Sequence, residues 1–266
     1  MTVTLALQGW ALGALLATLG WALSLPRRDA SLADRLWGLL VAAPVLWVAW
    51  RLPAALAVDH RAAWVLALLL LWAVRLTVYI TWRNWGHGED RRYAAMRQAH
   101  GASFAWRSLF TVFLLQATIA WVLGWPLLAA LAAAAPMGLL DVAGIALAAS
   151  GLVIETVADA QMARFRGNPA HAGQVMDRGL WRWSRHPNYF GEACVWWGLA
   201  LLAWGGGAPA WLVVCPLMMT FLLLRVSGVR LLEQDIAERR PAYRDYIART
   251  SAFVPWFPRR VAERGP

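Results

Sequence analysis

Three polar clusters separate long apolar segments of the chain, and they contain many of the residues that could do chemistry. They cover residues 83–93, 164–169 and 178–192. Each combines arginine with glycine and asparagine, and the first and third add tryptophan, tyrosine and carboxylates. Guanidinium groups bind phosphate through paired hydrogen bonds and stack on aromatic rings, while glycine lets backbone amides approach an anion closely. The clusters therefore predict a site for an anionic cofactor that carries phosphates and a base.

Other kinds of site fit these clusters less well. Anionic lipid headgroups also attract arginine, but they do not account for the asparagine, tyrosine and carboxylates between the arginines. No GxGxxG segment follows a predicted strand, so any nucleotide would be bound by a membrane fold rather than by a Rossmann domain. Cys194 and Cys215 lie in apolar segments without metal-ligand spacing, so we expect neither a disulfide nor a metal site.

Ionisable residues also occur at and inside the apolar segments, where each costs a few kcal/mol. Glu155 and Asp159 are four residues apart, which places them on one face of a helix. The others are Asp34, Arg35, Arg75, Glu192, Arg225, Arg230 and Glu233. Pairing of boundary residues would explain any one of them. A polar, water-filled cavity open to the cytoplasm would explain the whole set.

Seven apolar segments must position these residues. They cover residues 4–25, 33–50, 62–82, 108–133, 139–161, 188–204 and 208–229. About 20 apolar residues cross a hydrocarbon core of roughly 30 Å, and 60% of the chain is hydrophobic with a mean hydropathy of +0.48. We therefore predict an all-α, polytopic integral membrane protein with seven transmembrane helices. Residues 1–266 would form one domain, and Thr4–Leu25 would be a retained first helix.

The distribution of arginine predicts the topology. The chain has a net charge of +10, with 25 arginines and no lysine. Nearly all arginines outside the helices lie in the linkers 26–32, 83–107 and 162–187 and in the tail from residue 230. The alternate linkers contain only Arg51 and Arg61. The positive-inside rule then places the N-terminus outside and the C-terminus in the cytoplasm, as in a bacterial inner membrane. Because the arginines lie in short loops between apolar segments, we expect no nucleic acid partner.

The third cluster and several other motifs resemble the steroid 5-alpha-reductase superfamily, and more narrowly its bacterial DUF1295-type branch. The signature is Gly179-Leu180-Trp181 followed by Arg185-His186-Pro187-Asn188-Tyr189-Phe190-Gly191-Glu192. Further similar motifs, in the same order, are Asp34 with Trp37-Gly38, Arg83-Asn84, Gly88-Glu89-Asp90, Arg92-Tyr93, Leu232-Glu233, Arg239-Arg240-Pro241, Tyr243, Tyr246, Arg249-Thr250-Ser251-Phe253 and Pro255-Trp256-Phe257-Pro258. The resemblance covers most of the chain.

The resemblance implies a membrane enzyme that uses NADPH to reduce the 4,5 double bond of a 3-oxo-4-ene steroid or a similar lipophilic enone. By the family pattern, the cofactor would be bordered by Asp159, Arg164, Arg166, Asn188, Glu192 and Arg230. We also expect near the cofactor Arg75, Arg83, Asn84, Asp90, Tyr93, Arg178, Trp181, Arg185, His186, Tyr189, Glu233 and Tyr243. Glu192 would orient the nicotinamide or help to deliver the proton. Asp34 and Tyr79 are the candidates for polarising the substrate ketone, with Trp72 as the competing alignment for Tyr79.

Two alternatives remain at this point. Isoprenylcysteine and phospholipid methyltransferases of the same superfamily share the Arg-His-Pro-x-Tyr-x-Gly core and bind S-adenosylmethionine. Asn188 and Glu192 extend the match beyond that core, and the number of arginines suits a cofactor with three phosphates, so NADPH is favoured. The second alternative is a non-enzymatic lipid-binding protein. We expect a monomer whose partners are membrane lipids and a lipophilic substrate.

Overall fold

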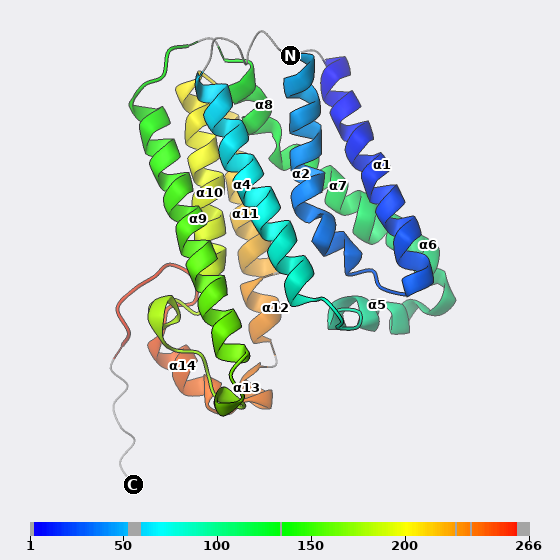
Figure 1. Cartoon of the computed structure of the whole chain (residues 1–266), viewed down its shortest axis with the longest axis vertical. Helices are drawn as coiled ribbons and strands as arrows, with labels where there is room; N and C mark the ends of the chain where they lie inside the picture. The colour runs from blue at the N-terminus through cyan, green and yellow to red at the C-terminus, as the bar shows by residue number, and fades with distance from the viewer. Residues whose placement is uncertain (1–2, 53–59, 134, 227, 235, 260–266) are drawn as a thin grey trace. The chain divides into compact units, whose positions relative to one another are not determined.

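The regular structure in the described part of the chain is helical throughout (Figure 1). The computed structural model describes residues 3–52, 60–133, 135–226, 228–234 and 236–259. No strand occurs within these ranges. The all-α architecture expected from the apolar segments is therefore confirmed for the residues that the structure describes.

Six helical segments among these residues are long and apolar enough to cross a membrane. They are α1 (Val3–Arg27), α2 (Leu32–Arg51), α4 (His60–Arg83), the run Arg91–Leu131, α9 (Leu139–Arg166) and the run Ala210–Glu233. The seventh expected segment, 188–204, forms α10 (Pro187–Gly205). Polar Asn188 and Glu192 in its first turns lower its apolar content, and α10 does not count among the six. The seventh span and the orientation of the helices therefore remain predictions.

Two of the six runs are interrupted helices. The first consists of α5 (Arg91–His100), η1 (Gly101–Ser103), α6 (Phe104–Ser108), η2 (Leu109–Leu114), α7 (Leu115–Leu123) and α8 (Trp125–Leu131). The second consists of η5 (Ala210–Val213), α11 (Val214–Phe221), η6 (Leu222–Val226) and α12 (Val229–Glu233). Both η2 and η6 are π-helical. A π turn contains an extra residue, so it changes which side chains face the neighbouring helices.

Short helices also form in the polar segments outside these runs. They are η3 (Pro169–His171), η4 (Gly179–Arg182), α13 (Ile236–Arg239) and α14 (Tyr243–Arg249). Asn168 caps η3, since its side chain accepts a hydrogen bond from the amide of Ala170. The polar segments between and after the apolar helices therefore have defined backbone structure.

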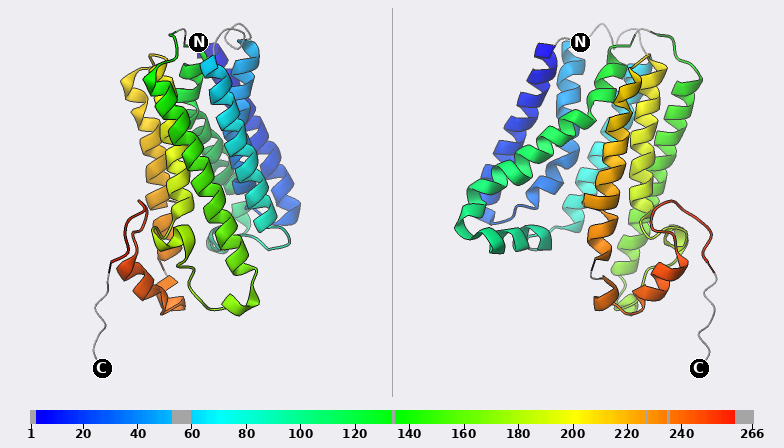
Figure 2. Two further views of the ribbon diagram at one scale, coloured as in Figure 1. Left: turned by 60° about the vertical axis from the view of Figure 1, so that its left-hand side comes forward. Right: turned by 180° about the vertical axis from the view of Figure 1, so that it is seen from behind.

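The chain divides by internal packing into two compact units. Unit 1 consists of Met1–Val142 and Leu199–Cys215, and unit 2 consists of Ala143–Gly198 and Pro216–Pro266. Within unit 1, α1 packs on α2, α2 packs on α4, and α7 contacts both α1 and α2 (Figure 2). A Cβ atom on Gly38 of α2 would lie 2.6 Å from the carbonyl oxygen of Ala73 on α4. Glycine at this position therefore permits α2 and α4 to approach closely.

A buried ion pair fixes the end of unit 1 at which α4 and α9 begin. Both side chains, Arg61 and Asp141, are 0% exposed. Arg61 donates from Nε to Asp141 Oδ1 (2.7 Å) and from Nη2 to Oδ2 (3.0 Å). Its remaining donors reach the carbonyl oxygens of Ala135 (2.8 Å) and Pro136 (3.1 Å), and the Gly138 amide donates to Asp141. Arg61 was predicted to lie in the linker before the third apolar segment, whereas its side chain is completely buried.

Backbone contacts between α9 and α10 define the geometry of unit 2. A Cβ atom on Gly151 would lie 2.5 Å from the carbonyl oxygen of Gly191, and one on Gly191 would lie 2.7 Å from the amide of Glu155. A Cβ atom on Gly198 would lie 2.6 Å from the amide nitrogen of Ala148. Because no side chain separates the two helices there, polar residues on their facing sides are brought into direct contact.

Candidate functional site

The closest approach of α9 and α10 brings together the carboxylates and the amide predicted for the cofactor site. Asn188 of α10 donates from Nδ2 to Asp159 Oδ1 on α9, at 3.2 Å. Glu155, Asp159 and Glu192 are all buried. The Oδ1 atom of Asn188 is buried and has no hydrogen-bond partner among the described residues. Such an atom normally costs about 1–3 kcal/mol, so a hydrogen-bond donor from a ligand would stabilise it.

Arg185 is bound by protein groups in unit 2. It donates to both carboxylate oxygens of Glu233 (2.7 and 2.9 Å) and to the carbonyl oxygens of Ile247 (3.1 Å) and Thr250. The Nε2 atom of His186 lies 2.9 Å from the same carboxylate. We call these five residues the Arg185 cluster. It connects the start of α10 to α12 and to the end of α14, which is a structural role as far as its contacts show.

A second set of contacts attaches the C-terminal segment to the loop before α10. The hydroxyl of Tyr246 donates to the carbonyl oxygen of Trp181, and Trp181 Nε1 donates to Ala158 of α9 at 2.9 Å. Burial, followed by the nearby Glu233 carboxylate, raises the pKa of Tyr243 to about 12. Burial also raises the pKa of Tyr246. Both phenols therefore stay neutral at physiological pH and act as hydrogen-bonding and packing groups.

The remaining predicted residues of unit 2 lie at its polar end. Four of the predicted arginines are exposed, namely Arg164, Arg166, Arg178 and Arg230. Tyr189 stacks on His186, with ring centroids 5.5 Å apart and an interplanar angle of 2°. Unit 2 thus contains buried acceptors between α9 and α10 and exposed guanidinium groups on its loops and helix ends.

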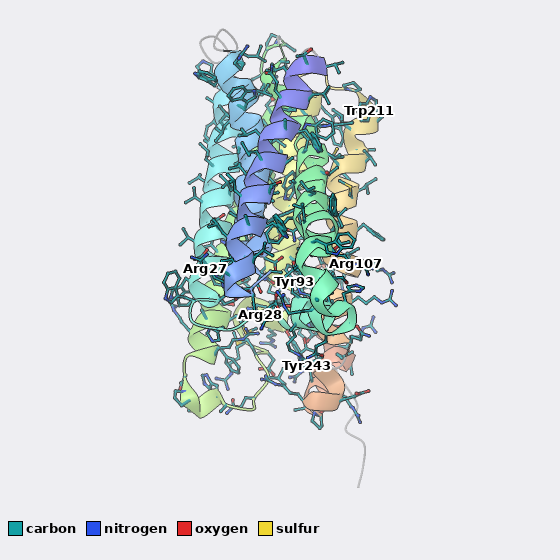
Figure 3. All side chains as sticks on the ribbon, turned by 90° about the vertical axis from the view of Figure 1, so that its right-hand side faces the viewer. Arg27, Arg28, Tyr93, Arg107, Trp211 and Tyr243 are labelled. Carbon is teal, nitrogen blue, oxygen red and sulfur yellow. The ribbon has the colours of Figure 1, made fainter. Side chains whose placement is uncertain are left out.

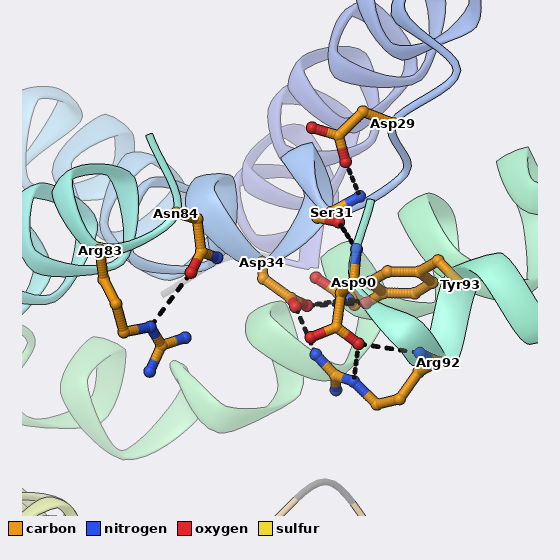
Figure 4. Close-up of polar contacts among 9 residues, drawn as sticks. Asp29, Ser31, Asp34, Arg83, Asn84, Asp90, Arg92 and Tyr93 are labelled. Carbon is orange, nitrogen blue, oxygen red and sulfur yellow. Dashed lines mark hydrogen bonds and ion pairs between the residues drawn. The ribbon is translucent and has the colours of Figure 1, made fainter. Parts of the chain in front are cut away.

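A separate polar cluster lies in unit 1, where α2 begins (Figure 4). The Tyr93 hydroxyl donates to Asp34 Oδ1 at 2.7 Å, and Arg92 Nη2 donates to Asp34 Oδ2 at 2.6 Å. Gln116 of α7 donates from Nε2 to the Tyr93 oxygen (3.2 Å) and to Asp34 (3.4 Å). The Oε1 atom of Gln116 is buried without a partner among the described residues. Gln116 was not predicted, because a single glutamine in an apolar segment gives no motif.

The Glu89 carboxylate holds the loop before α5 against the residues that precede α2. Glu89 accepts hydrogen bonds from Nη2 and Nε of Arg97 (2.7 and 2.9 Å) and from the Ala30 amide (2.8 Å). Asp90 caps α5 through the amide of Arg92. Burial opposes ionisation of both carboxylates, but the hydrogen bonds from Arg97 and Ala30 lower the pKa of Glu89, and those from Arg92 lower the pKa of Asp90.

The lowered pKa of Glu89 predicts a pH-dependent difference between the wild type and Glu89→Gln. A depressed folded-state pKa stabilises the protein above the unfolded value, about 4.3–4.5, and the stabilisation is lost as pH falls through the folded pKa. At pH 7 we expect Glu89→Gln to unfold at a lower temperature, by the equivalent of about 1–3 kcal/mol. Below about pH 4.5 the difference should shrink, and it should vanish once the pH is below the folded-state pKa. Melting curves from pH 7 to about pH 3 test this, and a pH-independent difference contradicts it.

The predicted residues of α4 lie in a row along that helix. The guanidinium carbons of Arg75 and Arg83 lie 5.3 and 5.7 Å from the centroid of the Tyr79 ring. Arg83 also donates to Asn84 Oδ1 at 3.1 Å. Trp72 is fully buried, whereas Tyr79 is half-buried. Tyr93, whose hydroxyl donates to Asp34, was predicted as a cofactor residue.

An open groove runs along the same part of unit 1. It has a volume of about 700 Å³ and is lined by Thr77, Val78, Thr81, Trp82 and Trp85. Its lining is mainly apolar.

The labelled residues of unit 1 lie at two levels of the bundle (Figure 3). Arg27, Arg28 and Arg107 lie toward the end that contains Tyr93, and Trp211 lies toward the other end. Trp125 packs edge-on against Trp211, with ring centroids 5.8 Å apart. Arg27, Arg28 and Arg107 therefore lie near Tyr93 at one end of unit 1, and Trp125 and Trp211 pack together toward the other end.

The helices and their apolar lengths define an integral membrane protein. A model of the family DUF1295, "Protein of unknown function", matches residues 20–250, so the chain belongs to this family. It is also 26% identical over 273 residues to the uncharacterized protein C594.04c of Schizosaccharomyces pombe. That match covers 93% of this chain and 78% of the relative. No solved structure matches the chain.

Proposed function

We propose that this protein is an NADPH-dependent membrane reductase that acts on the activated C=C bond of a lipophilic enone, such as a 3-oxo-4-ene steroid. The motif resemblance of residues 179–192 to the steroid 5-alpha-reductases supports this reaction class. The observation that carries the proposal is that unit 2 separates buried hydrogen-bond acceptors from exposed arginines. Acceptor groups are buried between α9 and α10, and arginines are exposed at the polar end.

The buried residues fit the nicotinamide end of such a cofactor. The unpartnered Asn188 Oδ1 can accept a hydrogen bond from the carboxamide, and Asp159 holds the Asn188 side chain in place through Nδ2. Glu192 lies one turn beyond Asn188 on α10, on the same helical face. The nicotinamide ring of bound NADPH supplies a hydride. Asn188, Asp159 and Glu192 would therefore orient this ring.

The exposed arginines fit the other end of the cofactor. NADPH carries three phosphates, and guanidinium groups bind phosphate with paired hydrogen bonds. Arg164, Arg166, Arg178 and Arg230 would supply these contacts. S-adenosylmethionine has no phosphate, so NADPH suits these exposed arginines better.

The Asp34 cluster of unit 1, taken by itself, contains a hydrogen-bond donor of the kind that stabilises a carbonyl oxygen as it gains negative charge. The Tyr93 hydroxyl is the candidate donor, and Asp34 and Gln116 fix its position. Reorientation of the hydroxyl from Asp34 to a substrate oxygen would provide the hydrogen bond. We further propose that the polar end of each unit faces the cytoplasm of a bacterial inner membrane, as the arginine distribution predicts.

Nucleotide binding by purified protein in detergent tests the proposal. NADPH at 100 times its Kd should stabilise the folded protein by about 2.7 kcal/mol. Asn188→Ala should fold normally and bind NADPH about 5–150 times more weakly, since one buried hydrogen bond is worth about 1–3 kcal/mol. Gln98→Ala, at an exposed position of α5 outside the proposed site, is the control.

Different outcomes separate the candidate functions. A melting shift with S-adenosylmethionine and none with NADPH would favour the methyltransferase. A shift with neither would favour a lipid-binding protein. Turnover of a 3-oxo-4-ene steroid that falls in Tyr93→Phe, without weaker NADPH binding, would support the role of Tyr93.

A further inference from the structure

An exposed apolar surface in unit 2 lies outside the long apolar helices. It consists of Trp183 in the loop before α10 and of Val254, Trp256 and Phe257 near the C-terminus, with exposed fractions of 37%, 54%, 67% and 72%. We call these four residues the aromatic surface. The rings of Trp183 and Phe257 meet edge to face, with centroids 5.1 Å apart, and Trp256 contacts Phe257 at 6.4 Å.

Backbone hydrogen bonds hold the aromatic surface in place. The amide of Trp256 donates to the carbonyl oxygen of Trp183 at 2.9 Å, and the amide of Arg185 donates to the carbonyl oxygen of Ser251 at 2.8 Å. Ser184 Oγ donates to the carbonyl oxygen of Phe253 at 2.7 Å. The C-terminal segment therefore runs beside the loop as a fixed element, and its aromatic side chains are exposed by the fold itself.

The depth of this surface follows from its connection to α9. Trp181, two residues before Trp183, donates to the carbonyl oxygen of Ala158 at 2.9 Å. Ala158 is the twentieth residue of α9, which begins at Leu139. Twenty helical residues rise about 30 Å, the thickness of the hydrocarbon core. The loop therefore attaches to α9 at the level where that helix reaches the membrane–water interface.

The chemistry of the surface fits the lipid headgroup region. Tryptophan and phenylalanine bury their rings at the boundary between headgroups and acyl chains, and neighbouring arginines attract anionic lipids. Arg182 and Arg259, which flank the aromatic residues in sequence, are exposed. Asp177 in the preceding loop is ion-paired with Arg249.

We propose that the aromatic surface binds the headgroup region of an anionic lipid leaflet and anchors the C-terminal segment to the membrane. The residues after α14 are then an interfacial element rather than a soluble tail. The anchor lies beside the Arg185 cluster. The Arg185 amide donates to the carbonyl oxygen of Ser251, and Ser184 Oγ donates to the carbonyl oxygen of Phe253. This proposal is independent of the reductase proposal, because it needs no cofactor.

Spin-label accessibility tests the proposal. The full-length protein, with Cys194→Ala and Cys215→Ala, would carry a label at Val254→Cys and be reconstituted in phosphatidylcholine vesicles that contain phosphatidylglycerol. We expect the label to be accessible to oxygen and shielded from a water-soluble nickel chelate. A label at Arg244→Cys, on the exposed side of α14, is the control and should show the opposite pattern.

Two results would overturn the proposal. Access of the nickel chelate to position 254 at the level of position 244 would place the surface in water. Exclusion of both reagents would show that protein, from this chain or a second copy, covers the surface. A Trp256→Ser/Phe257→Ser variant gives a second measurement, because it should raise the nickel accessibility at position 254 by several-fold.

Discussion

Replacement of Asp141 by alanine should destabilise unit 1 by about 3–5 kcal/mol, because it leaves the buried guanidinium of Arg61 without its carboxylate. Both side chains are 0% exposed, so water cannot replace the lost partner. Reversible unfolding of the detergent-solubilised protein, followed by circular dichroism, measures the loss. The effect should not depend on nucleotide, since the pair lies at the opposite end of α4 from Arg83.

The double variant Arg61→Met/Asp141→Ala separates charge from packing. Removal of both charges eliminates the unpaired guanidinium, so the double variant should be more stable than Asp141→Ala alone. If the two variants are equally unstable, the loss comes from packing around Gly205 and Gly206, which lie against this pair. A loss below about 1 kcal/mol in Asp141→Ala would contradict the structural role.

Replacement of Arg185 by glutamine should release the C-terminal segment from the start of α10. It removes the charged partner of Glu233 and the donors to Ile247 and Thr250, so we expect a loss of about 3 kcal/mol. Hydrogen exchange of α14 amides should rise in parallel with a lower melting temperature. Arg182→Gln, in the same loop but exposed, is the matched control and should change neither measurement.

The same variant distinguishes the two roles that Arg185 could have. The arginine clusters in the sequence predicted that Arg185 contacts the cofactor. If Arg185→Gln keeps its stability but loses NADPH affinity, the side chain binds the cofactor. If α14 loosens first and affinity falls only as a result, Arg185 is a positioning residue. A second substitution, Arg178→Gln, should weaken NADPH binding without loosening α14.

The membrane helices could be predicted because their signal is local. A segment such as 62–82 needs only length and apolarity, and the structure has the helix at His60–Arg83. The polar loops were harder. Arg185 donates to carbonyl groups more than 60 residues further along the chain, at Ile247 and Thr250. Backbone acceptors leave no mark in a sequence, so an arginine that binds them cannot be told from one that binds phosphate.

The site residues show the same limit. The four-residue spacing of Glu155 and Asp159 predicted that they share one face of a helix. Asn188 makes its buried hydrogen bond to Asp159 on this face. The partner of Asp34 could not be predicted in this way, because Tyr93 and Gln116 come from different helices. Their meeting depends on how α5 and α7 pack in unit 1, which no local pattern records.

The π-helical segment η2 ends at Leu114, two residues before Gln116. Successive residues of an α-helix are about 100° apart around its axis. Loss of one residue from the segment would restore a regular helix and rotate every later side chain of α7 by that angle relative to α6. Gln116 would then point away from Asp34, while the amino-acid types around both residues stayed the same. The number of residues in Leu109–Leu114, as much as their identity, therefore determines which way this amide points.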